Sequence, residues 1–393
     1  MYDITTYGAS TGLSDNAPAI NAAISAACSA GGGEVYVPPG TWKVQSQIQL
    51  MRNVFLMGGT PNHYWWGNRS TSTIEVDWGV GSSSNPALAA VTLVASSGAS
   101  KLCFSYPWQS LSSAPVECGA TFSWDYREIN AKTNITINDC HFDRAYVAAD
   151  LRGHGPGNNL GCAYLSFTNN TGSPLKHALR INFIVDWCEF SNNSFNSGSC
   201  APAQPITALT TWCINNAVLY EIGRSDWVQL TNCKHWGYFC AFNFDVSGDY
   251  YTGSGPFTVN GCETDGCMAG VNIQGKVGAL SILNSVFTSF NPTSSTSWWT
   301  VGIGGASGVD SFQFCNNYIF GPNAGIVWFG QPDQIIRDVV ITGNIARVDP
   351  THANCPVYIA SSEKLLACGN IFTGYPSPPV FNSTHYATSG NLL

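Results

Sequence analysis

The sequence predicts an all-β protein, a β-solenoid with one α-helix near its N-terminus. Three observations support this prediction: only one segment has the apolar spacing of an ordinary helix, a short strand-and-turn pattern recurs along the chain, and a second short strand follows it at a regular distance. Charged residues make up 10% and aromatic residues 12% of the 393 residues. Disordered chains show the opposite balance, so the chain is expected to fold.

The predicted helix lies between residues 14 and 33. Ser14 or Asp15 can cap its first turn, Pro18 suits that turn, and Gly31–Gly33 end it. The apolar positions follow the spacing of a single helix face: Ile20, Ala23, Ile24 and Ala27. Most of the remaining chain is predicted as short strands separated by Gly, Asn, Ser and Pro.

The recurring pattern is an apolar residue, any residue, an apolar residue, two turn-type residues and a small side chain. The eight copies end at Cys140, Cys188, Cys233, Cys262, Ser285, Asn317, Asn344 and Asn370. From Cys233 onward the spacings are 29, 23, 32, 27 and 26 residues, which suits one coil of a solenoid. These side chains are expected to form one column that is hydrogen-bonded from coil to coil, although Asn, Ser and Cys also favour turns for local reasons.

The second strand of each coil alternates in period two, so its side chains point alternately into and out of the coil. The positions predicted to face inward are Phe242, Phe244, Val271 and Ile273. The positions predicted to face outward are Asn243, Asp245, Asn272 and Gln274. One face of the solenoid should therefore present polar side chains to solvent.

Residues Thr5–Val44 resemble the N-terminal signature of pectate-lyase-like right-handed parallel β-helix proteins. The matching elements are Tyr7, Gly8, Ala9, Asp15, Ala19, Ile20, Ala22, Ala23, Gly31–Gly33, Val35, Val37, Pro38, Gly40 and Trp42. The resemblance implies a helix that caps the open end of the solenoid, followed by its first coil. Among the family's members, the chain looks most like phage tailspike polysaccharide depolymerases, which implies a homotrimer.

A single β-helix domain is predicted over residues 1–393. Its expected parts are the cap and first coil (1–45), irregular early coils with loops (46–130), regular coils (131–375) and a C-terminal tail (376–393).

The net charge of −8 argues against nucleic acid as a partner. No apolar run is long enough for a membrane span, and no signal peptide is visible. A virion tail or extracellular location is expected, and the fifteen cysteines are expected to be mostly buried and reduced.

Cleavage of a glycosidic bond requires two carboxyl groups across the bond, about 5–5.5 Å apart for retention and about 6.5–9.5 Å for inversion. Neighbouring coils and alternate positions on one strand offer separations in this range. Glu221 and Asp245 are the predicted acid/base pair, with Asp226 and Asp249 in reserve. Any one of these acids could instead be a solvated or turn carboxylate.

The predicted substrate-binding residues combine aromatic rings, which stack on sugars, with outward amides. They are Trp212, Trp227, Trp236, Asn243, Tyr250, Asn272 and Gln274. Each tryptophan could instead pack internally or lie at a trimer interface. No cofactor and no metal are expected, because no motif for either is evident.

The predicted function is hydrolysis of a bacterial surface or extracellular polysaccharide by this carboxylate pair. One alternative is a non-catalytic, glycan-binding or structural β-helix of a virion. Another is a polysaccharide lyase, which would need cations to neutralise a uronate carboxylate. The chain has only 16 Lys and Arg residues and no dense cluster of them in sequence, so hydrolysis is favoured.

Overall fold

The computed structural model describes most of the chain. The described residues are 1–59, 72–124, 134–152, 162–184, 186–201, 203–245, 255–289, 299–304, 309–321, 326–329, 336–348 and 355–391. The predicted fold is confirmed, because short strands pair in parallel from one coil to the next and a helix precedes them. The chain divides into two compact units, Met1–Trp212 and Cys213–Leu393.

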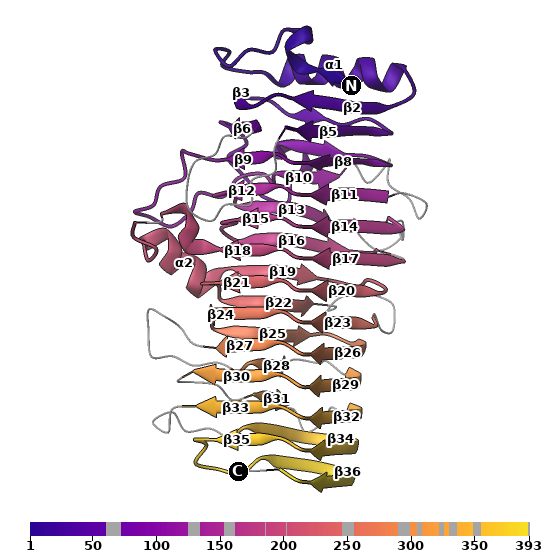
Figure 1. The fold of residues 1–393 in the computed structure, drawn as a ribbon, viewed down its shortest axis with the longest axis vertical. Helices are drawn as coiled ribbons and strands as arrows, with labels where there is room; N and C mark the ends of the chain where they lie inside the picture. Colours follow the sequence, from indigo (N-terminus) through magenta and orange to yellow (C-terminus); the bar gives the residue numbers. More distant parts are fainter. Residues whose placement is uncertain are drawn as a thin grey trace. The chain divides into compact units, whose positions relative to one another are not determined.

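The first unit begins with the predicted capping helix, α1 (Ala17–Ser29), which lies across the end of the strands that follow (Figure 1). Asn16 is the N-cap residue, and the Asp15 carboxylate accepts a hydrogen bond from the backbone N–H of Ala17 at 3.0 Å. The predicted apolar stripe of α1 is fully buried. The helix therefore covers core that an open solenoid end would expose.

The described strands of the first unit form three stacks of parallel strands. The first stack contains β1 (Tyr2–Asp3), β2 (Gly33–Val37), β5 (Val54–Gly58), β8 (Ser97–Ser100), β11 (Asn134–Asn138), β14 (Tyr164–Thr168) and β17 (Trp187–Ser191). The second contains β4 (Ile48–Gln49), β7 (Val91–Leu93), β10 (Phe122–Trp124), β13 (Val147–Arg152) and β16 (His177–Asn182). The third contains β3 (Gly40–Val44), β6 (Ser72–Val76), β9 (Cys103–Ser105), β12 (His141–Asp143), β15 (Thr171–Gly172) and β18 (Ser194–Asn196).

The remaining helices in the described residues are short. They are the 3-10 helices η1 (Ile4–Tyr7), η2 (Pro86–Leu88) and η3 (Ser197–Cys200), and the α-helix α2 (Ala208–Asn216). Among the described residues, no helix is long and apolar enough to cross a membrane.

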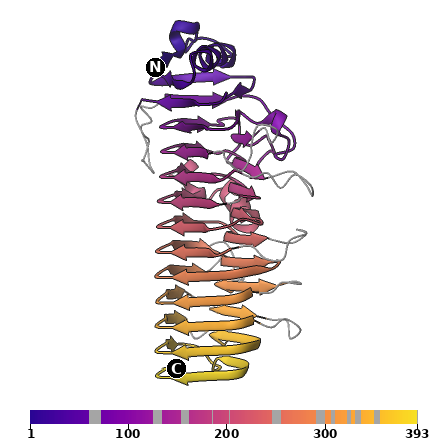
Figure 2. The same cartoon turned by 90° about the vertical axis from the view of Figure 1, so that its right-hand side faces the viewer.

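The second unit also contains three stacks of parallel strands. Within this unit, successive coils lie at successive levels in Figure 2. The first stack contains β20 (Val228–Thr231), β23 (Phe257–Asn260), β26 (Val277–Leu283), β29 (Val309–Cys315), β32 (Ile336–Thr342), β34 (Val357–Cys368) and β36 (Val380–Ser389). The second contains β19 (Val218–Ile222), β22 (Cys240–Asp245), β25 (Ala269–Gln274), β28 (Val301–Gly304) and β31 (Val327–Phe329), with the start of β34. The third contains β21 (Lys234–Trp236), β24 (Glu263–Cys267), β27 (Val286–Ser289), β30 (Tyr318–Gly321), β33 (Ile345–Val348) and β35 (Ile371–Thr373).

The segment predicted as a C-terminal tail contains strand β36, which pairs in parallel with β34 over most of its length. The pairing continues the first stack of the second unit by one more coil. A single domain over residues 1–393 stays a prediction.

The predicted column of turn residues is present in each unit as a ladder of hydrogen bonds. Each residue of the column is a rung of the ladder. In the second unit, the backbone N–H of one rung donates to the side-chain Oδ1 of the rung in the next coil. These bonds run from Ser285 to Asn317 (2.9 Å), from Asn317 to Asn344 (2.9 Å), from Asn344 to Asn370 (3.1 Å) and from Asn370 to Asn391 (3.1 Å). Each asparagine amide also donates to a backbone carbonyl of the preceding coil, as Asn344 does to Phe314 at 2.8 Å. The ladder thus satisfies backbone groups that the turns bury.

One predicted rung was wrong. Cys188 lies within β17 opposite Leu165, and it is buried in the core. The rung of that coil is Asn193, whose Oδ1 accepts from the N–H of Asn170, while the Oδ1 of Asn170 accepts from the N–H of Cys140. The rung directly follows a residue in the left-handed conformation, here Asn192 at φ 56°. This backbone turn, rather than the apolar pattern before it, defines the position of the column.

Several cysteine side chains are buried thiols, as the composition led us to expect. Cys140, Cys262 and Cys267 are at most 1% exposed. Burial raises the pKa of Cys140 and of Cys267 to about 12 and raises the pKa of Cys262 well above its ordinary value. These groups therefore stay protonated at neutral pH and lack the nucleophilicity of a thiolate.

Candidate functional site

The second stack of the second unit carries the predicted polar face. Phe242, Phe244, Val271 and Ile273 are fully buried, which confirms the predicted inward positions. Asp245 and Asn272 are half-buried and Gln274 is exposed, while Asn243 is 8% exposed and accepts a hydrogen bond from the amide of Asn272 at 2.7 Å. The two amides therefore form a fixed pair at equivalent positions of adjacent coils.

Glu221 and Asp245 belong to this same face. Glu221 in β19 is the register partner of Asn243 in β22, and Asp245 lies two residues further along β22. With strands about 4.8 Å apart and a rise of about 3.3 Å per residue, this diagonal places their Cβ atoms about 8 Å apart. Leu219, two residues before Glu221 on β19 and therefore at a position of the same alternation, is fully buried.

The other predicted site residues are dispersed. Asp226 is half-buried between β19 and β20, and Trp227 beside it is 60% exposed at φ 52°. Trp236 lies in β21, in the third stack, and its indole packs over Gly266. Trp236 therefore does not share the strand stack of Glu221 and Asp245. Asp249 and Tyr250 lie outside the described residues.

Trp212 belongs to the first unit, in α2. The ammonium of Lys176 lies 5.5 Å from the centroid of its ring, and the ring of Tyr146 lies 6.3 Å away. The indole is half-buried by these contacts. These intramolecular contacts occupy part of the ring surface that a sugar would use.

A second pair of carboxylates occupies β24. Glu263 and Asp265 are alternate residues of this strand, and Lys234 lies 3.4 Å from Glu263. Burial raises the pKa of Asp265, and the charge of Glu263 raises it further, while the Thr288 hydroxyl and the Gly266 N–H oppose the shift. The two carboxyl groups thus differ in environment, as those of an acid/base pair do.

The raised pKa of Asp265 predicts a pH dependence of stability. The folded state binds this proton more tightly than the unfolded chain, so the stabilisation is complete below the ordinary pKa of 3.8 and is lost as the pH rises through the folded-state pKa. We expect Asp265→Asn to flatten the fall in the urea midpoint as the pH rises above 3.8. If the urea midpoints of the wild type and the variant changed in parallel with pH, a raised pKa of Asp265 in the folded state would be contradicted.

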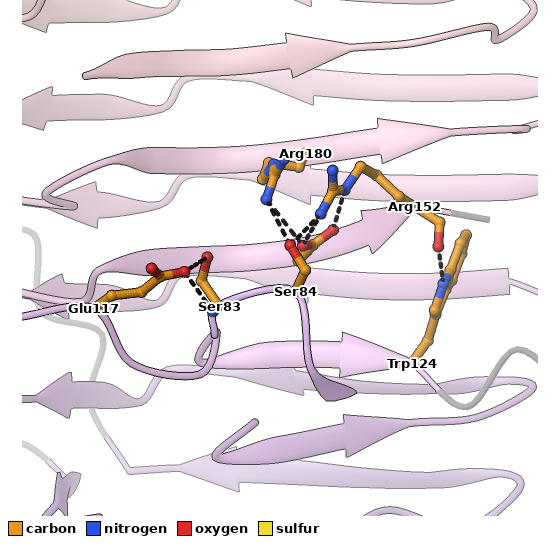
Figure 3. A network of polar contacts seen from close by, with 7 residues as sticks. Ser83, Ser84, Glu117, Trp124, Arg152 and Arg180 are labelled. Carbon is orange, nitrogen blue, oxygen red and sulfur yellow. Dashed lines mark hydrogen bonds and ion pairs between the residues drawn. The ribbon is translucent and has the colours of Figure 1, made fainter. Parts of the chain in front are cut away.

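Sequence reasoning missed a cationic cluster on the second stack of the first unit (Figure 3). Arg152 donates to both oxygens of Asp150, from Nε at 2.8 Å and Nη2 at 2.7 Å, and Arg180 donates to Oδ2 at 3.3 Å. Both guanidinium groups also donate to the hydroxyl of Ser84, at 2.8 and 3.3 Å. Asp150 is 6% exposed, so two cations surround one buried carboxylate.

The cluster could not be recognised from sequence proximity. Asp150 and Arg180 are thirty positions apart and meet because they are register partners across β13 and β16. Glu117 lies apart from the two arginines and accepts from the N–H and hydroxyl of Ser83 at 2.8 and 2.9 Å (Figure 3). Only an alignment of coils could have predicted that Asp150 and Arg180 adjoin.

Among the described residues, no group of three or more His, Cys, Asp and Glu could hold a metal ion.

Comparison with known proteins supports the predicted resemblance. A family model described as rhamnogalacturonase A/epimerase, pectate lyase-like, matches residues 1–65. A search of curated protein sequences found no match. The resemblance to the pectate-lyase-like β-helix proteins, predicted from residues 5–44, is thereby confirmed for the N-terminal segment.

Solved structures with the same fold cover nearly the whole chain. The A-module of mannuronan C-5 epimerase AlgE6 from Azotobacter vinelandii is 16% identical, with 100% of this chain and 99% of that chain covered and a TM-score of 0.58. A mutant tailspike protein of E. coli bacteriophage HK620, in complex with a hexasaccharide, is 10% identical over 94% of this chain and 64% of that chain (TM-score 0.54). DFA-IIIase from Arthrobacter chlorophenolicus A6 is 13% identical over 99% and 84% (TM-score 0.50). At these identities the likeness establishes the parallel β-helix fold.

Proposed function

We propose that this protein degrades a bacterial surface or extracellular polysaccharide by hydrolysing its glycosidic bonds. Glu221 and Asp245 act as the acid/base pair, Asp226 and Asp249 remain reserve acids, and Asn243 and Asn272 hold sugar hydroxyls. The observation that carries the proposal is the register of Glu221 with Asn243, which sets Asp245 on the neighbouring coil of the same face. A Cβ separation of about 8 Å suits the inverting geometry, in which a water molecule enters between the two groups.

The structural neighbours support a polysaccharide as the substrate. They include a mannuronan epimerase module and a tailspike bound to a hexasaccharide. A tailspike-like homotrimer at the virion tail, or an extracellular protein, is the setting we propose. Trp227, Gln274 and Tyr250 remain candidate sugar contacts, as do Trp212 and Trp236.

The test is to incubate the protein with capsule and lipopolysaccharide preparations and to measure released reducing ends. Hydrolysis should release reducing ends without a rise in ultraviolet absorbance. Retained binding without any release would contradict the enzyme proposal and favour the non-catalytic alternative.

A polysaccharide lyase is the second candidate, and the Arg152–Arg180 cluster favours it. Elimination from a uronic acid proceeds through a carbanion that is stabilised when cations neutralise the sugar carboxylate. Two guanidinium groups around Asp150 carry a net positive charge. An unsaturated product that absorbs in the ultraviolet would support this candidate over hydrolysis.

A further inference from the structure

The first stack of the first unit exposes an aromatic pair that the proposed chemistry does not use. Tyr164 in β14 and Trp187 in β17 are register partners, and their rings pack edge to face with centroids 5.7 Å apart and an interplanar angle of 88°. Trp187 is 49% exposed. The contact with Tyr164 therefore fixes the indole while leaving about half of it open to solvent.

A carboxylate is built into the same surface. Ser166 and Glu189 are the next outward register partners, and the hydroxyl of Tyr164 donates to Oε2 of Glu189 at 3.1 Å. The hydroxyl of Ser191 donates to Oε1 at 3.2 Å. Each carboxylate oxygen can accept more than one hydrogen bond, so Glu189 keeps acceptor capacity while its position is fixed.

Burial and the adjacent Glu189 charge raise the pKa of Tyr164, so its phenol stays protonated and continues to donate to Glu189. Asp186, beside Trp187, is exposed and adds a second negative charge to this surface. An anionic sugar would be repelled here, whereas the hydroxyl groups of an uncharged sugar would find acceptors.

We propose that Trp187, Tyr164 and Glu189 form a binding subsite for an uncharged pyranose unit of a glycan. The sugar's C–H face stacks on the indole of Trp187, and its hydroxyl groups donate to Glu189. The rings are already ordered, so binding costs little side-chain freedom. The choice of a glycan as the ligand rests on the proposed function, but the subsite does not depend on Glu221 or Asp245.

The test is native electrophoresis of the full chain through gels that contain dextran, galactomannan or mixed-linkage β-glucan, with alginate as the charged comparison. The wild type should be retarded by at least one neutral polysaccharide and not by alginate. Trp187→Ala should weaken the apparent affinity roughly three- to tenfold, the effect of losing one aromatic stacking contact. Tyr164→Phe, which keeps the ring and removes the donor to Glu189, should weaken it roughly two- to fivefold.

Met51→Ala is the matched control, because Met51 is another large apolar side chain of the first unit and is 39% exposed. It should migrate as the wild type does. The proposal is overturned if no neutral gel retards the wild type, or if Trp187→Ala keeps full retardation. If Trp187→Ala changed the sedimentation coefficient and left the retardation unchanged, Trp187 would instead be a contact between copies of the chain.

The two proposals fail separately. Glu221→Gln and Asp245→Asn should lower turnover, whereas Trp187→Ala should lower retardation. Weakened retardation in Trp187→Ala, together with full turnover in both Glu221→Gln and Asp245→Asn, would reject the catalytic assignment and retain the subsite.

Discussion

Glu221→Gln and Asp245→Asn are each expected to reduce polysaccharide turnover by about 10²- to 10⁴-fold, the usual contribution of a positioned general acid or base. Each substitution keeps the size of the side chain and removes its ability to exchange a proton. Both side chains are on the outer face rather than in the core, so the urea midpoint should stay close to that of the wild type. Initial rates of reducing-end release would measure the effect.

Asp338→Asn is the matched control for these variants. Asp338 is an outward carboxylate of β32 in the same unit, and it pairs with Lys364 at 3.6 Å on an exposed surface. Its removal should leave turnover unchanged and cost little stability. Full activity in both Glu221→Gln and Asp245→Asn would refute the assignment, and Glu263 and Asp265 would then be the next pair to test.

Asn344→Ala should lower the free energy of unfolding by about 2–4 kcal/mol, because it leaves buried backbone groups without partners. The Asn344 side chain accepts from the N–H of Asn317 at 2.9 Å and donates to the carbonyl of Phe314 at 2.8 Å, and the residue is fully buried. Both partners would lose a hydrogen bond that water cannot replace. Urea denaturation followed by circular dichroism would measure the loss.

Gln229→Ala is the control for this prediction, since Gln229 is an exposed amide on β20 of the same unit. A change within about 0.5 kcal/mol is expected there. If Asn344→Ala were equally mild, the ladder would be a consequence of the coil geometry rather than one of its stabilising interactions.

Much of the fold could be predicted because each coil obeys local rules. The apolar stripe that contains Ile20 and Ala27 identified the capping helix, and the alternation of Phe242 and Phe244 gave the inward face of β22. Period-two burial is a property of one strand, so a single sequence is enough to reveal it.

Exact turn positions and the register between distant strands were harder to predict. Cys188 fitted the apolar pattern, yet Asn193 forms the rung, because the left-handed residue before it determines the turn. Arg180 lies beside Asp150 because β13 pairs with β16, and the sequence separation of the two residues does not reveal this pairing. Trp236 was close in sequence to the predicted acids but belongs to another stack.

The buried thiols give this protein built-in reporters of local opening. Cys140 belongs to the first unit, whereas Cys262 and Cys267 belong to the second, and all three are closed to solvent. A thiol reagent can modify them only when the coil that holds them separates from its neighbours. The order in which mass spectrometry detects their labelling would therefore show which coil of this repetitive structure opens first, with no engineered probe.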